Sequence, residues 1–75
     1  MLTVYSSPAC AWCDRLKDYL NSRHAEYTVV DVSASRENFD RMLLASGQRA
    51  VPVTVGEHGE VVIGFDQIAI DKLLQ

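Results

Sequence analysis

The chain has 75 residues, a net charge of −3 and 48% hydrophobic residues, which is typical of one small globular domain spanning 1–75. Its charges are mixed with no basic stripe, and no apolar run approaches the roughly 20 residues that cross a bilayer, so neither a nucleic acid nor a membrane is an expected partner. The start of the chain lacks the basic segment, the apolar segment and the cleavage site that make up a signal peptide. We therefore expect a cytoplasmic monomer in a reducing compartment.

The chain opens with a strand pattern followed by a helix pattern. Leu2–Tyr5 is short and β-prone, and Ser6–Pro8 ends it. From about Cys10 to Arg23 the apolar residues recur with helical spacing, which places three of them on one face: Cys13, Leu16 and Leu20. This spacing predicts a helix packed through that face.

A second strand and a second helix follow. Tyr27–Val32 is a nearly continuous apolar run, which predicts a strand covered on both faces. Ser33–Ser35 offers an N-cap, and Gly47 is typical of the residue that ends a helix. Between them the residues in helical register are Phe39, Met42, Leu43 and Ser46.

The last third of the chain predicts a hairpin and a short helix. Val51–Val55 is a strand with Pro52 at its start, where proline is tolerated. Gly56–Gly59 is a turn, so Glu60–Ile63 returns antiparallel. Asp66 is a good N-cap for a final helix with a buried stripe of Ile70, Leu73 and Leu74.

The resulting order is β-α-β-α-β-β-α. The opening βαβ unit implies parallel strands joined by a right-handed crossover, and the closing hairpin adds an antiparallel strand. The sequence therefore predicts an α/β fold, with a four-stranded mixed sheet flanked by three helices.

The only two cysteines form a Cys10-Ala11-Trp12-Cys13 motif directly after the first strand. The loop that they close is too short to constrain an unfolded chain much, so the pair calls for a chemical explanation. Free N–H groups at a helix N-terminus stabilise a thiolate, and C-x-x-C thiols there have pKa values between about 3.5 and 7.5, against about 8.5 for free cysteine. We expect Cys10 to be the attacking thiolate and Cys13, about one turn deeper, to resolve the mixed disulfide.

Metal binding is the main alternative chemistry. A tetrahedral zinc site needs four ligands, and the spacing of His24 and His58 does not fit one. Copper-chaperone domains have a different element order and a Met-Thr before the first cysteine, where this chain has Pro8 and Ala9. We expect no metal site, and two alternatives to the enzyme stay open: a metal or iron–sulfur carrier, and a protein-interaction module without turnover.

Three segments together resemble the glutaredoxin family: Tyr5–Cys13, Ser46–Val53 and Val62–Asp66. Their order and spacing cover nearly the whole chain, and the match is closest to short bacterial glutaredoxin-like and NrdH-redoxin proteins. The resemblance implies a minimal thioredoxin-like fold. It also implies a thiol–disulfide oxidoreductase that reduces protein or small-molecule disulfides.

The resemblance also implies where substrate binds. It implies a cis Val51–Pro52 peptide beside the cysteines, which would present the Val51 backbone to an extended substrate. Trp12 would line the rim, and Gly64–Asp66 resembles the segment that binds the γ-glutamyl end of glutathione. The implied substrate-binding residues are Ala11, Trp12, Val51, Pro52, Gly64, Phe65 and Asp66.

Dithiol exchange needs no bound cofactor, but it needs an external reductant, either glutathione or an NADPH-dependent thioredoxin reductase. Ser7 stands where many family members place lysine, and Ile63-Gly64 stands where glutaredoxins usually show two glycines, which weakens the case for glutathione. The alternative is an NrdH-type electron donor to ribonucleotide reductase. NrdH-like proteins usually carry Arg-Pro after Gly-Phe, where this chain has Asp66-Gln67.

Overall fold

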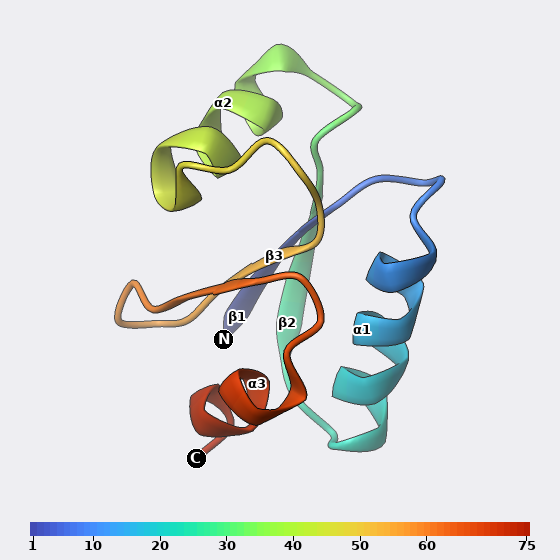
Figure 1. The fold of residues 1–75 in the computed structure, drawn as a ribbon, viewed down its shortest axis with the longest axis vertical. Coiled ribbons are helices and arrows are strands. Elements are labelled where there is room, and N and C mark those ends of the chain that lie inside the picture. The colour runs from blue at the N-terminus through green and yellow to red at the C-terminus, as the bar shows by residue number, and fades with distance from the viewer.

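The computed structural model describes all 75 residues and contains four strands and three helices (Figure 1). In chain order they are β1 (Leu2–Ser6), α1 (Ala11–Ser22), β2 (Tyr27–Asp31), α2 (Arg36–Ser46), β3 (Val53–Val55), β4 (Val61–Ile63) and α3 (Gln67–Leu73). This order confirms the predicted β-α-β-α-β-β-α arrangement.

The four strands form one mixed sheet in the order β2-β1-β3-β4. β1 is parallel to β2 and antiparallel to β3, and β3 is antiparallel to β4. In this register Val4 lies opposite Thr54, and Thr54 lies opposite Val62. Directly opposed side chains point to the same face, so these three residues form a row across the sheet.

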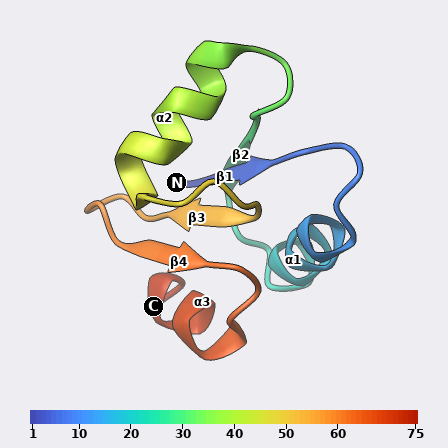
Figure 2. The ribbon, with the colours of Figure 1, turned by 45° about the horizontal axis from the view of Figure 1, so that its top comes forward.

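Helices cover both faces of the sheet, as the sequence predicts. Figure 2 shows α2 on one side and α1 with α3 on the other. The cluster under α1 and α3 contains Leu2, Val4, Leu16, Leu20, Val62 and Ile70, and the cluster under α2 contains Tyr5, Val30, Met42 and Val53. Cys13, Leu16 and Leu20 have no exposed surface, which confirms the predicted buried stripe of the first helix.

Local capping explains where the helices begin and end. The Ser35 hydroxyl accepts a hydrogen bond from the Asn38 N–H at 3.1 Å at the start of α2. Gly47 ends that helix with φ at 70°, a left-handed conformation that glycine adopts without a steric penalty. A carboxylate oxygen of Asp66 accepts from the Ala69 N–H at 3.2 Å and caps α3, as predicted.

One prediction about the second strand is wrong. β2 is not covered on both faces, because Thr28 and Val29 are exposed. The reason is its position at the edge of the sheet, with β1 as its only neighbour. In the last helix Ile70 is buried, whereas Leu73 and Leu74 are only half-buried. None of the three helices is long and apolar enough to cross a membrane.

Candidate active site

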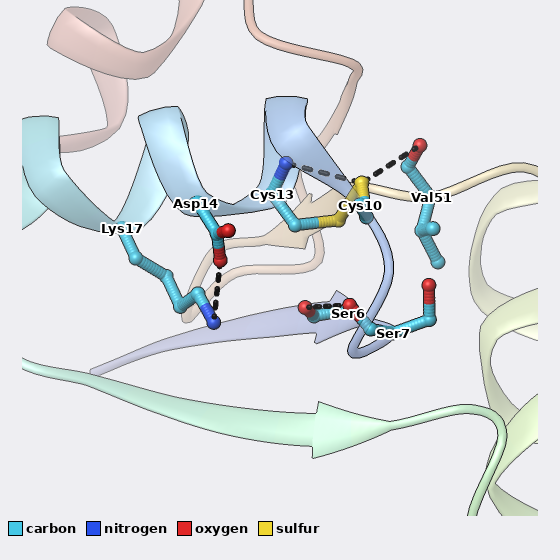
Figure 3. Close-up of a disulfide and its surroundings, with 7 residues drawn as sticks. All are labelled: Ser6, Ser7, Cys10, Cys13, Asp14, Lys17 and Val51. Carbon is cyan, nitrogen blue, oxygen red and sulfur yellow. Dashed lines mark hydrogen bonds and ion pairs between the residues drawn. A yellow bond between two sulfur atoms is a disulfide. The ribbon is translucent and has the colours of Figure 1, made fainter.

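Cys10 is the N-cap residue of α1. Its backbone is extended, with φ −129° and ψ 103°, so the side chain turns back over the first turn of the helix. There its sulfur accepts a hydrogen bond from the Cys13 N–H, with 3.1 Å between nitrogen and sulfur (Figure 3). This N–H is one of the helix-terminal donors that lack a helical partner. Together with the helix dipole it favours negative charge on the Cys10 sulfur.

The two cysteines differ in exposure although their sulfur atoms lie at disulfide distance. Cys10 is half-buried, and Cys13 has no exposed surface. Their Cα atoms are 5.2 Å apart, within the usual range for a disulfide. An external molecule can therefore reach Cys10 first, and Cys13 is placed to react only with a partner already on Cys10.

The Val51–Pro52 segment lies directly beside the cysteines. Its peptide bond is cis, as the resemblance implied. The Val51 carbonyl oxygen lies 4.0 Å from the Cys10 sulfur, and the Val51 N–H has no hydrogen-bond partner within the chain (Figure 3). Pro52 is buried, and its carbonyl accepts from the Gly64 N–H at 2.9 Å. This bond joins the second and third family-like segments at one site.

A groove of about 300 Å³ opens next to this segment, and its walls are uncharged. It is lined by Trp12, Val51, Pro52, Gly64 and Phe65. The ring of Trp12 is 56% exposed, and its centroid lies 6.5 Å from that of Phe65 with a tilted geometry. The groove therefore offers aromatic surface and backbone groups within reach of Cys10.

The groove brings together five of the predicted substrate-binding residues and leaves out two. Ala11 is exposed on the first turn of α1, and Asp66 is exposed with its carboxylate engaged in capping α3. Neither of them lines the groove. Sequence reasoning missed Arg15, whose guanidinium carbon lies 4.8 Å from the centroid of the Trp12 ring. The spacing of three residues on a helix is the signal that could have found it.

No group of three or more His, Cys, Asp and Glu side chains is arranged to hold a metal ion. His24 and His58 are exposed and line a separate polar pocket between the β3–β4 turn and the C-terminal helix. The site at Cys10 thus consists of two sulfurs, one backbone segment and an apolar groove.

Comparison with known proteins agrees with this geometry. The family model described as Glutaredoxin matches residues 2–59. The chain belongs to the glutaredoxin family. A glutaredoxin-like 8.6 kDa protein from the rubredoxin operon of Clostridium pasteurianum, itself described as uncharacterized, is 35% identical over 75 residues, which is all of this chain and 99% of the relative.

Two further matches describe the relationship in more detail. The N-acetyl-S-hydroxy-L-cysteine reductase of Bacillus subtilis is 31% identical over 72 residues, covering 96% of this chain and 77% of the relative. The crystal structure of the thioredoxin-like protein BC3987 superposes with a TM-score of 0.88 at 29% identity, covering 97% of this chain and 99% of the other. This glutaredoxin-family protein therefore has a thioredoxin-like fold, as the resemblance implied.

Proposed function

We propose that this glutaredoxin-family protein is a dithiol–disulfide oxidoreductase in which Cys10 attacks and Cys13 resolves. One observation carries the proposal. Cys10 is accessible, hydrogen-bonded by a helix N-terminal N–H and adjacent to the Val51 backbone, while Cys13 is fully enclosed. The arrangement provides a stabilised nucleophile and a protected second thiol, and it requires no bound metal or organic cofactor.

Substrate binding uses the backbone of Val51. Its free N–H and its carbonyl pair with an extended substrate segment, as in the addition of a strand to a sheet. The side chains that flank the substrate cysteine then rest against Trp12 and Phe65. Backbone pairing is indifferent to sequence, so the apolar groove supplies the selectivity.

The reaction proceeds in two exchanges. The Cys10 thiolate attacks one sulfur of the substrate disulfide, and the other substrate sulfur leaves as a thiolate that takes up a proton. Cys13 then loses its proton and attacks the Cys10 sulfur, which releases the second substrate thiol. The substrate gains two electrons and two protons, and the protein is left with the Cys10–Cys13 disulfide.

A protein disulfide is the substrate class that the groove supports best. Glutathione carries two carboxylates and an ammonium group, and none of the five residues lining the groove is charged. For the same reason we propose thioredoxin reductase as the reductant in preference to glutathione. An NrdH-type role as electron donor to ribonucleotide reductase is one form of this proposal.

A second candidate substrate is the sulfenic acid of a small acylated cysteine. The name of the Bacillus subtilis relative describes such a substrate, which has one carboxylate and no ammonium group. The single cation of Arg15 beside Trp12 could pair with that carboxylate, whereas it would leave the second carboxylate and the ammonium group of glutathione without partners. The Cys10 thiolate would attack the sulfenic sulfur, and the S–O bond would break with the hydroxyl taking up a proton and leaving as water. The product is a mixed disulfide between Cys10 and the acylated cysteine, which Cys13 resolves. Replacing Arg15 with Gln should raise KM for the carboxylate substrate and leave KM for its neutral amide unchanged.

Two parallel assays of NADPH consumption test the proposal, one with glutathione and glutathione reductase and one with thioredoxin reductase. We expect turnover of a protein disulfide with thioredoxin reductase, and none with the Cys10→Ser variant. Turnover with glutathione alone would contradict the proposed reductant. Inactivity in both assays with an intact fold would contradict the oxidoreductase, and a stoichiometric metal count or visible colour would then indicate a metal or iron–sulfur carrier.

A further inference from the structure

Three buried side chains carry a hydroxyl: Tyr5, which belongs to the cluster under α2, and Ser6 and Thr54. Ser6 is 3% exposed and Thr54 is fully buried. The Thr54 Oγ1 atom has no hydrogen-bond partner, and the Ser6 hydroxyl makes only a long contact of 3.5 Å to the Ser7 carbonyl. Buried hydroxyls nearly always have partners, because burial without one is unfavourable by about 1–3 kcal/mol. An unpaired hydroxyl in so small a core therefore needs a reason.

The sheet register places Thr54 under α1. Thr54 lies between Val4 and Val62 in the row across the sheet, and both neighbours belong to the cluster packed under α1 and α3. Its side chain therefore points to the same side as the buried stripe of α1. Ser6 faces this side too, since it follows Val4 by two residues on one strand.

The direction of α1 places Cys13 near the end of β1, where Ser6 lies. α1 connects two parallel strands and so runs back along β1, with Leu20 toward the start of β1 and Cys13 toward its end. Figure 3 shows Ser6 at that end of β1, beneath the two sulfur atoms. Ser6 and the enclosed sulfur thus lie at the same end of β1. Thr54, opposite Val4, lies on the same face of the sheet and two residues further from that end of β1.

Chemistry at Cys13 calls for a hydrogen-bond donor there. When a reductant thiolate attacks Cys10 in the disulfide, the S–S bond breaks and its electron pair moves onto the Cys13 sulfur, which then takes up a proton from solvent. Cys13 has no exposed surface, and no Lys, Arg or His side chain is buried. A buried anion is strongly unfavourable unless it is hydrogen-bonded. Lys17, which Figure 3 shows near the disulfide, is half-buried and paired with Asp14, so the buried side-chain donors on this face of the sheet are the hydroxyls of Ser6 and Thr54.

We propose that the Thr54 hydroxyl donates a hydrogen bond to the Cys13 sulfur in the reduced protein, with the Ser6 hydroxyl as a second donor. The inference rests on the dithiol mechanism proposed above. Thr54 keeps its own proton throughout, so it stabilises and positions the Cys13 thiolate without exchanging atoms. In the disulfide form no acceptor, sulfur included, lies in hydrogen-bonding geometry to Thr54 Oγ1, so the bond forms only after the S–S bond breaks and the Cys13 side chain is released.

The first test titrates Cys13 as the sole thiol in a Cys10→Ser background, following the ultraviolet absorbance of the thiolate. Thr54→Val, which replaces the hydroxyl with a methyl group, should raise the pH of half-ionisation by about one unit, a tenfold change in the ionisation equilibrium. Thr54→Ser, which keeps the hydroxyl, should titrate like the parent. An unshifted titration for Thr54→Val would overturn the proposal.

The second test measures the redox potential of the Cys10–Cys13 pair in protein with both cysteines. At a pH above the half-ionisation of Cys13 found in the first test, where the reduced form keeps the Cys13 thiolate, losing a donor should make Thr54→Val about tenfold harder to reduce, which is about 30 mV for a two-electron couple. Ser6→Ala should shift the potential in the same direction and serves as the probe if Thr54→Val does not fold. A purely structural role would change the stability of both redox forms equally, and unchanged potentials in the folded variants would overturn the inference.

These two tests separate the inference from the proposed function. The titration of Cys13 does not depend on turnover, so it reports on Thr54 even if no disulfide substrate is reduced. Inactive protein with a shifted titration contradicts the oxidoreductase alone. Active protein with an unshifted titration contradicts the role of Thr54 alone.

Discussion

The backbone N–H of Cys13 donates a hydrogen bond to the Cys10 sulfur, with 3.1 Å between the two atoms. The same sulfur lies 4.0 Å from the carbonyl oxygen of Val51. It therefore lies between a donor that favours its thiolate and a backbone carbonyl that we propose binds the backbone of a substrate. The proposed activating group and the proposed substrate-aligning group thus belong to different segments of the chain, so each can be altered separately.

Replacing Cys13 with Ser should trap mixed disulfides on Cys10. The donor to the Cys10 sulfur is a backbone N–H, so the substitution removes the resolving thiol and keeps the hydrogen bond. Incubation with a protein disulfide followed by intact-mass spectrometry should show one adduct, released by added thiol. The Cys10→Ser variant is the matched control and should form no such adduct. A failure of Cys13→Ser to trap any disulfide substrate would contradict the assigned order of attack.

Replacing Trp12 with Ala should weaken substrate binding without unfolding the protein. Trp12 forms one wall of the groove and is 56% exposed, so its loss removes contact area for the substrate and little from the core. We expect kcat/KM for a protein disulfide to fall about tenfold, or about 1.4 kcal/mol, mainly through KM. Ile68→Ala is the control, because Ile68 is 74% exposed and lies outside the groove. Equal effects of the two substitutions would exclude the groove as the binding surface.

Replacing Leu16 with Ala should strongly destabilise the fold. Leu16 is fully buried in the cluster under α1, and truncating such a side chain lowers the free energy of unfolding by about 2–5 kcal/mol. Leu44→Ala, on the exposed side of α2, should change it by no more than about 0.5 kcal/mol. Urea unfolding of both variants in the disulfide form measures the difference. Similar unfolding midpoints would show that the core is not built around this face of α1.

The loop from β2 to α2 should loosen at acid pH. The hydroxyl and the backbone N–H of Ser33 both donate to Asp31, and these bonds hold the pKa of the Asp31 carboxyl below its usual value. A lowered pKa in the folded protein means that the stabilisation is complete above about pH 3.9, the value for an unfolded chain, and is lost as pH falls through the folded value. The Asp31→Asn variant should show a smaller loss of stability over this range. Identical acid-unfolding curves for the two proteins would contradict this role.

Local features of the chain were predictable from the sequence because their causes are local. Helical spacing alone places Cys13 on the buried stripe of α1, and the caps at Ser35, Gly47 and Asp66 depend on a few neighbouring residues. The placement of Cys10 at the helix start follows from the same reasoning. These elements required no knowledge of the strand order.

Features that depend on packing between distant segments were not predictable in this way. The apolar run of β2 is compatible with a central or an edge position, and only the strand order exposes Thr28 and Val29. The unpaired hydroxyl of Thr54 results from the register of three strands with one helix, which no single segment encodes. The stacking of Arg15 on Trp12 depends on side-chain conformations that helical spacing permits but does not require.

The atom that caps α1, the Cys10 sulfur, is also the atom that we propose as the nucleophile. A thiolate accepts a hydrogen bond from the Cys13 N–H more strongly than a sulfur in a disulfide does, so the first turn of α1 is held more firmly in the reduced protein. The stability of α1 and the redox potential of the Cys10–Cys13 pair are therefore thermodynamically linked. A substitution that destabilises the first turn of α1 should therefore change the redox potential of the Cys10–Cys13 pair, even if it touches neither sulfur atom.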